Sequence, residues 1–179
     1  MQIELFDPNT LSIREMPAQA AEILVDLPRL AASREDDAVL GRIYPKPSTQ
    51  TDLQEDWNEI IRPELRELFQ SAAEIVKADL TTISQDSLTR GFEVTFPRKH
   101  ADAWLNCLNQ VRIVMGTKIN YVEGDALIEQ VSEPRTEAER RRFQVIAQMD
   151  FYAHLQESII AALDYVEGFE DEDEEQTFE

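Results

Sequence analysis

The sequence predicts a mainly α-helical protein of the α+β class, in which a helical bundle carries a small antiparallel sheet. Three observations support this fold class. Residues 1–16 alternate apolar and polar side chains on both sides of a turn signal, residues 91–97 alternate in the same way, and most of the remaining chain has apolar residues at helical spacing. We therefore expect residues 1–166 to form a single helical domain with an N-terminal hairpin.

The sheet is predicted from two segments. The first is a hairpin whose turn is the run Asp-Pro-Asn-Thr at 7–10, and the second is GFEVTFP at 91–97, which Pro97 ends. An isolated hairpin is only marginally stable, so we expect the second segment to add a third strand. One face of this sheet should carry the apolar side chains Ile3, Leu5, Leu11, Ile13, Phe92, Val94 and Phe96.

Prolines and capping residues mark the expected helices of the first half. Pro17 suits the first position of a helix that runs to about Ser33 and kinks or restarts at Pro28. A short helix is expected before the Tyr-Pro step at 44–45. A capping box at 51–54, Thr-Asp-Leu-Gln, begins a long amphipathic segment.

Acidic residues dominate the composition. The chain has 36 acidic and 17 basic side chains, a formal net charge of -19 at pH 7, which repels free nucleic acid and suits a basic protein partner. Thr136 and Glu139 form a second capping box before a helix that is expected to run to about Val166. Residues 167–179, which are rich in carboxylates, are expected to form a disordered tail.

Several classes of site find no support. Cys107 is the only cysteine, so an intramolecular disulfide is excluded and a reducing compartment fits. No signal peptide and no apolar run of roughly 18 residues is found, and we expect a cytoplasmic protein that does not bind a membrane. Neither glycine-rich phosphate motif occurs, and the two histidines lack a metal-ligand pattern. We assign no catalytic, cofactor-binding or metal-binding residue, and no cofactor.

An arginine interrupts the apolar run AWLNCLNQVRIVMG at 103–116. On a helix, Asn109, Arg112 and Gly116 form a stripe beside the apolar face that contains Trp104 and Leu108. A buried arginine needs carboxylate or carbonyl partners. Arg112 is therefore interpreted as a structural clamp, with Asn109 in the same network and Gly116 admitting a close neighbour, and a ligand-binding arginine is the alternative.

A second group of polar residues lies in the last helix. Asp150, His154 and Glu157 are spaced i, i+4 and i+7 and share one face. A carboxylate beside a histidine suits a general base or half of a metal site, and it equally suits a solvated face with one ion pair. We treat both groups as one candidate polar network, structural or functional.

Three segments resemble DUF2017, a bacterial family of domains of unknown function. They are AVLGRIYPKP (38–47), WLNCLNQVRIVMGTKI (104–119) and HLQESIIAAL (154–163). Gln110 and Pro63 depart from the family pattern. The resemblance implies a fold and a gene position often beside the Clp protease adaptor, and it implies no activity and no cofactor. The residues that match the pattern are Trp104, Asn109, Arg112, Gly116 and the step Gln156-Glu157-Ser158.

Three functions follow as hypotheses. The leading one is a non-catalytic interaction or regulatory module, linked to Clp-dependent proteolysis by the resemblance alone. The second is a small-ligand binder or enzyme with a polar site around Arg112, which side chains converging on an open cleft would favour. The third is an acidic mimic of nucleic acid, which evenly spaced acids along one face would favour. A homo-oligomer is compatible with each.

Overall fold

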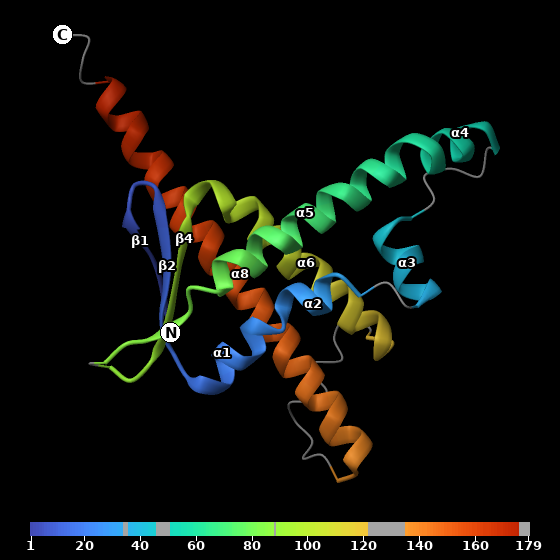
Figure 1. Ribbon diagram of the computed structural model, residues 1–179, viewed down its shortest axis with the longest axis horizontal. Coiled ribbons are helices and arrows are strands. Elements are labelled where there is room, and N and C mark those ends of the chain that lie inside the picture. The colour runs from blue at the N-terminus through green and yellow to red at the C-terminus, as the bar shows by residue number, and fades with distance from the viewer. Residues whose placement is uncertain (34–35, 46–50, 88, 122–134, 176–179) are drawn as a thin grey trace.

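The computed structural model shows a four-stranded antiparallel sheet beside a bundle of helices (Figure 1). It describes residues 1–33, 36–45, 51–87, 89–121 and 135–175. The mainly helical α+β class predicted from the sequence is confirmed. The sheet has the order β1-β2-β4-β3, with strands β1 (Gln2–Asp7), β2 (Thr10–Met16), β3 (Ser84–Gln85) and β4 (Phe92–Pro97).

Helices make up most of the described chain, and in these residues no helix is long and apolar enough to cross a membrane. Pro28 restarts the first helix after a break, and Pro63 lies in the first turn of the longest helix of the N-terminal half. The helical elements are α1 (Ala18–Val25), α2 (Leu27–Ala31), α3 (Asp37–Ile43), α4 (Thr51–Asp56), the π-helical turn η1 (Trp57–Ile61), α5 (Arg62–Leu80), the 3₁₀ turn η2 (Arg98–His100), α6 (Ala101–Lys118) and α8 (Glu137–Glu175).

The predicted hairpin and third strand are confirmed, and their register gathers the predicted apolar residues. Ile13 of β2 pairs with Ile3 of β1 on one side and with Val94 of β4 on the other, so the three side chains share a face. All seven predicted residues belong to the main core or pack against it. The fourth strand, β3, was not predicted because its two exposed polar residues show no apolar alternation.

A bulge in β2 needs a glycine at position 91. Glu15 has a φ of 56°, in the left-handed region, at the point where the register between β2 and β4 shifts. A Cβ added to Gly91 would lie 2.8 Å from the Cα of Glu15, closer than any side chain tolerates. The absence of a side chain at Gly91 therefore lets the chain pass β2 as it enters β4.

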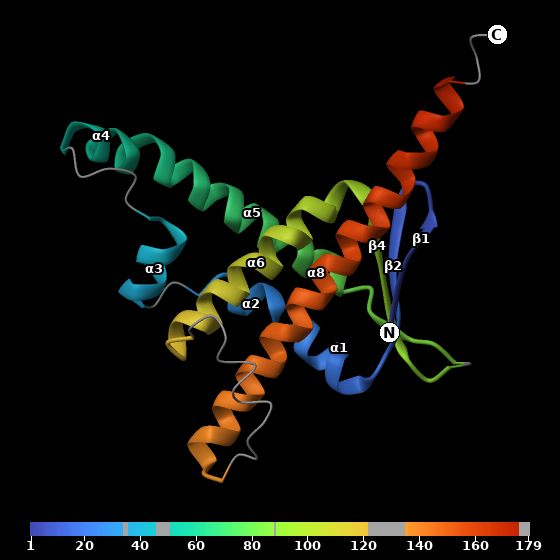
Figure 2. The ribbon, with the colours of Figure 1, turned by 180° about the vertical axis from the view of Figure 1, so that it is seen from behind.

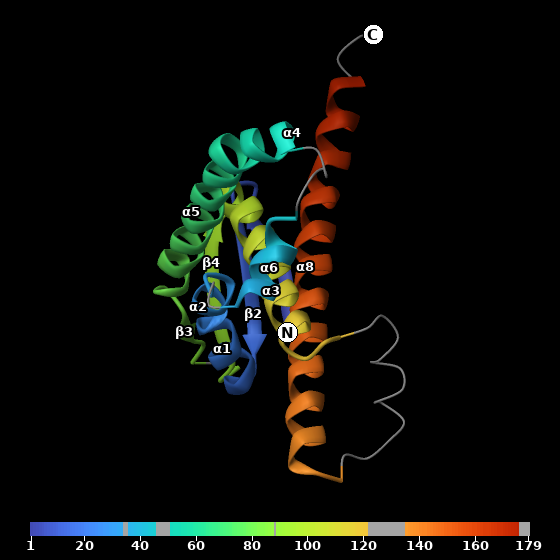
Figure 3. The same ribbon diagram turned by 90° about the vertical axis from the view of Figure 1, so that its right-hand side faces the viewer.

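Helix α6 is the central helix of the bundle. It lies between α5 and α8 and also contacts α2 and α3 (Figure 3). Trp104, Leu108, Val111 and Met115 are buried, which confirms the apolar face predicted for this helix. Cys107 is also fully buried and behaves as a small apolar residue.

The C-terminus of α6 is fixed by its own backbone and by α8. Asn120 has a φ of 48°, and the N–H of Tyr121 donates to the carbonyl oxygen of Gly116 over 2.8 Å, which is the Schellman arrangement. The guanidinium of Arg142, in α8, donates to the carbonyl oxygen of Ile119. A cation at a helix C-terminus also complements the helix dipole, so this contact joins the two helices where α6 ends.

Helix α8 begins at the predicted capping box and ends later than predicted. The N–H of Glu139 donates to Thr136 Oγ1 over 3.2 Å, and the N–H of Thr136 donates to Glu139 Oε2 over 2.8 Å. The backbone stays helical to Glu175 rather than ending near Val166. Glutamate is a good helix former and no proline interrupts this segment, which outweighs the unfavourable helix dipole. A domain limit at residue 166 and a disordered tail at 167–179 stay predictions.

Tyr152 joins α8 to α1. Its ring is fully buried, its hydroxyl donates to the carbonyl oxygen of Ile23 over 3.0 Å, and it accepts a hydrogen bond from Gln148 Nε2 over 2.9 Å. Burial disfavours the charged phenolate and raises the pKa of Tyr152 to about 12. The neutral phenol is thus one of the groups that hold the last helix on the body.

This pKa predicts a loss of stability at alkaline pH. Between pH 10 and 12 the unfolded chain has released the Tyr152 proton while the folded chain still holds it, so the free energy of unfolding falls as pH rises, by up to about 2–3 kcal/mol. Urea unfolding followed by circular dichroism should show this. Tyr152→Phe should cost about 1–2 kcal/mol at neutral pH, because the Ile23 carbonyl loses its donor, and should remove the additional alkaline loss. Equal alkaline losses in both proteins would show that Tyr152 is not responsible.

Candidate functional site

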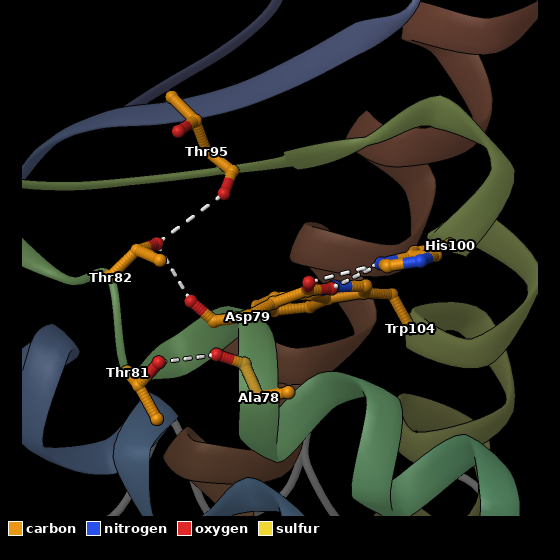
Figure 4. A network of polar contacts seen from close by, with 7 residues as sticks. All are labelled: Ala78, Asp79, Thr81, Thr82, Thr95, His100 and Trp104. Atoms are coloured by element: carbon orange, nitrogen blue, oxygen red, sulfur yellow. Dashed lines mark hydrogen bonds and ion pairs between the residues drawn. The ribbon is translucent and has the colours of Figure 1, made fainter.

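A buried carboxylate, that of Asp79, joins α5 to α6 (Figure 4). Asp79 lies in the last turn of α5, His100 is the N-cap of α6, and Trp104 lies one turn further along α6. His100 Nδ1 lies 3.0 and 3.1 Å from the two carboxylate oxygens, and Trp104 Nε1 donates to Oδ2 over 2.9 Å. The Asp79 side chain is 8% exposed and that of His100 is 26% exposed. The carboxylate is therefore held mainly by protein groups.

The path of the chain from β4 into α6 positions this site. β4 ends at Pro97, and the short turn η2 leads directly into α6, which brings Trp104 back over Phe96. The two rings stack with centroids 4.4 Å apart and planes at 17°. Thr82, just after α5, donates its hydroxyl to the backbone carbonyl of Asp79 over 2.8 Å (Figure 4). The sheet, α5 and α6 thus meet around one acid.

The position of Asp79 explains why it needs these donors. A negative charge at the C-terminal end of α5 opposes the dipole of that helix, and burial removes water from the carboxylate. The indole N–H and the imidazole compensate for both effects, and the carboxylate lies beside the first turn of α6, where the dipole favours an anion. These contacts also satisfy the polar atom of a fully buried Trp104.

The arrangement leaves one nitrogen of His100 directed away from Asp79. A carboxylate only accepts hydrogen bonds, so Nδ1 carries the hydrogen of this contact and Nε2 is the basic nitrogen of the neutral ring. Such a nitrogen can take up a proton or bind a metal ion, provided that a reacting group or further ligands are near. Within the part of the chain that the structure describes, no group of three or more His, Cys, Asp or Glu side chains could hold a metal ion.

Arg112, singled out in the sequence, contacts an amide of α8. Its Nη1 donates to Gln156 Oε1 over 2.9 Å in a partly buried setting. Gly116 lies next to α8 as well, because a Cβ added there would be 3.2 Å from Cε of Met149. Asn109 is exposed, and no hydrogen bond between described residues joins it to Arg112. The stripe on α6 therefore faces α8 through Arg112 and Gly116 but not through Asn109.

The second group of predicted residues stays on the surface. Asp150, His154 and Glu157 are all exposed on α8, whereas Tyr152 and Leu155 between them are buried. Among the described side chains, no ion pair joins these three residues to each other or to Arg112. The structure thus separates the predicted network into a contact between helices and a solvated face.

A hollow of about 600 Å³ lies between the end of α6 and the start of α8. It contains none of the six candidate residues and does not include Asp79 or His100. Its walls are apolar side chains and arginines that already contact protein groups, since Arg141 pairs with Glu137 at 3.2 Å and Arg142 bonds to Ile119. The residues that line it are Ile119, Glu137, Ala138, Arg141, Arg142 and Val145.

The Asp79 site is not among those predicted from the sequence, although two signals for it exist. Asp79 falls three residues after the buried Val76, on the apolar stripe of α5, where an acid is out of place. A tryptophan on a core face also needs an acceptor for its N–H. The two signals lie 25 residues apart, and only the fold brings them together.

Comparison with known families gives one result. The model of a family described as a domain of unknown function, DUF2017, matches residues 4–163. The chain belongs to this family. The resemblance noted in the sequence is thereby confirmed, and the matched span includes most of the hairpin, Asp79, His100 and the contact of Arg112 with Gln156. No curated protein and no solved structure matches this DUF2017 chain.

The geometry predicts that Asp79 is important for stability. Asp79→Ala should lower the free energy of unfolding by about 2–4 kcal/mol, because it leaves the buried indole N–H without an acceptor. Urea titration followed by circular dichroism measures this. The matched control is Glu74→Ala on the same helix. Glu74 is exposed and its Oε2 lies 3.8 Å from Nζ of Lys77, so this substitution should cost at most about 0.5 kcal/mol. Similar losses in the two variants would contradict the assigned role.

The partner of Arg112 predicts a smaller effect at that position. Breaking a buried ion pair at Arg112 would cost about 3–5 kcal/mol. Because Gln156 is uncharged and the contact is partly buried, we expect Arg112→Ala to cost about 1–2 kcal/mol and Arg112→Met to cost less. A double-mutant cycle with Gln156→Ala should give a coupling energy of about 1 kcal/mol. A coupling energy of zero would show that this bond does not clamp the helices.

Proposed function

We propose that this DUF2017 protein is a cytoplasmic, non-catalytic interaction or regulatory module that works by binding a protein partner. The observation that carries the proposal is that the buried and half-buried polar groups are used in contacts between helices. Asp79 is bonded to His100 and Trp104, and Arg112 is bonded to Gln156, so these side chains hold helices together. Their polar atoms are directed at neighbouring elements, as structural clamps require, and the surface is left for recognition.

The other two hypotheses receive less support from the geometry. A site for a small ligand around Arg112 would need its guanidinium to face a cleft, and Nη1 instead faces Gln156. A mimic of nucleic acid would need a regular row of acids. Exposed carboxylates lie on β1, α1, α5 and α8, which are separate elements that run in different directions (Figures 1 and 2).

The charge of the chain defines the chemistry of the partner. A net charge of -19 attracts basic surfaces and accelerates encounter with them. Resemblance to DUF2017 adds the finer proposal that this partner belongs to Clp-dependent proteolysis, either as a component or as a substrate delivered to it. A homo-oligomer would first have to overcome the repulsion between like-charged copies.

Capture from cytoplasmic extract tests the proposal. The intact chain, immobilised at about 0.15 M salt, should retain a discrete protein that mass spectrometry identifies, and raised salt should weaken the retention because charge contributes to binding. An unrelated protein of similar negative charge serves as the control for ion exchange. Retention of the same proteins by both baits would overturn the proposal. Repeating the capture with extracts that lack Clp components tests the link to Clp-dependent proteolysis. That link requires the set of retained proteins to differ between the two extracts.

A further inference from the structure

The N-terminal half of α5 projects from the body together with α4 and η1. We call residues 53–70 the arm. It extends away from the sheet and from α8 (Figures 1 and 2). The remainder of α5 packs on α6 and α2. One continuous helical rod is therefore buried at one end and projects at the other.

An apolar stripe runs along the whole rod. In the body it consists of Ala72, Val76 and Leu80, which are all buried. On the arm it continues at helical spacing with Leu53, Trp57, Ile61, Leu65 and Leu68. Steps of four residues drift around a regular α-helix, and the wider π turn η1 offsets part of this drift between Trp57 and Ile61.

The stripe is buried in the body, and much of it is exposed on the arm. Leu53 is 52% exposed and Leu68 is 53% exposed, while Ile61 is 39% exposed and its neighbour Ile60 is 55% exposed. These are four of the nine large apolar side chains found exposed in the described chain, and they lie within 16 residues of sequence. An exposed apolar patch of this kind is typical of a binding surface.

The side of the arm next to the body is already occupied. Phe69 packs against Tyr44 with ring centroids 5.9 Å apart, and Leu65 packs against the same small core cluster. The guanidinium of Arg62 lies 5.5 Å from the centre of the Tyr44 ring. These contacts hold the arm in place along one edge of the stripe, at Leu65, and leave Leu53, Ile61 and Leu68 exposed.

Acids surround the exposed stripe. Five acidic and two basic side chains lie in the arm, a net charge of -3, and one of the two cations, Arg62, is engaged with Tyr44. All of these acids are exposed: Glu55, Asp56, Glu59, Glu64 and Glu67. An apolar stripe bordered by carboxylates matches a helix that has an apolar stripe bordered by Lys or Arg.

We propose that the arm is the docking surface for a basic amphipathic helix of a partner protein. This inference rests on the proposed function and names the surface and the partner's chemistry. The partner's apolar side chains pack between Leu53, Ile61 and Leu68 as ridges into grooves, and its cations pair with the carboxylates of the arm.

Repulsion between acidic side chains disfavours two other possible occupants of the stripe. A second copy of the chain would bring two acidic arms together within a molecule of net charge -19. The C-terminal segment of the same chain, EGFEDEDEEQTFE at 167–179, is itself rich in carboxylates. Of the three occupants, only a basic amphipathic helix forms favourable contacts with both the apolar stripe and the carboxylates that border it.

Fluorescence anisotropy with a designed peptide tests the docking surface. The probe is a synthetic peptide as long as the arm, with leucines at helical spacing and lysines elsewhere. A scrambled peptide of the same composition, in which the leucines share no face, separates packing from charge. At about 0.15 M salt we expect the intact chain to bind the amphipathic peptide at least about tenfold more tightly than the scrambled one.

Matched triple variants locate the binding. Leu53→Gln, Ile61→Gln and Leu68→Gln together should weaken binding of the amphipathic peptide by about tenfold or more. The control triple, Phe6→Thr, Val25→Gln and Ile160→Gln, removes exposed apolar side chains elsewhere and should change binding by less than about twofold. Circular dichroism should show that both triples fold like the wild type. Equal binding of the two peptides, or equal losses in the two triples, would overturn the inference.

Two further readouts separate this inference from its alternatives. Sedimentation that shows a wild-type dimer, lost in the arm triple, would assign the stripe to a second copy and overturn the inference. In the capture experiment, equal retention of a discrete partner by the wild type and the arm triple would overturn the docking surface and leave the proposed function standing. Failure of the wild type to retain any partner would overturn the proposed function instead.

Discussion

The contact between Trp104 and Asp79 is the constraint on which the rest of the structure depends. Trp104 is fully buried at the start of α6, where its ring stacks on Phe96 of the sheet and its N–H donates to Asp79 in the last turn of α5. With this end of α6 fixed, its remaining buried residues lie between α5 and α8. The direction of the central helix, and with it the positions of the helices packed on it, follows from one aromatic ring and one carboxylate.

The elements that the sequence predicts well are those with strong local signals. The hairpin has a turn whose Asp7 Oδ1 accepts from the N–H of Asn9 over 2.8 Å, and α8 begins at a capping box in which both reciprocal bonds form. Pro28 marks the start of α2 for the same local reason. Fold class and core residues follow from such signals because each one fixes a short segment independently of its neighbours.

The candidate site was less predictable because its bonds connect distant segments. Arg112 is an anomaly in its helix, and the sequence shows that it needs an acceptor, but the identity of that acceptor depends on how α8 crosses α6. Asp79 and His100 lie on separate elements whose approach depends on the path from β4 into η2. Helical spacing places Asp150, His154 and Glu157 on one face of α8, and the rotation of α8 about its axis turns that face to solvent and away from Arg112.

The long last helix has a consequence for how the protein is made. Tyr152, Leu155 and Ile159 of α8 are fully buried in the main core, and α8 follows every other described element in the chain. During synthesis, the sheet and the earlier helices leave the ribosome with the α8-facing side of α6 open to water, and they cannot close their core until α8 has emerged. An interrupted chain therefore presents the bare side of α6 to chaperones and proteases, and completion of α8 conceals it. Closure of the main core therefore depends on the element that is made after all the other described ones.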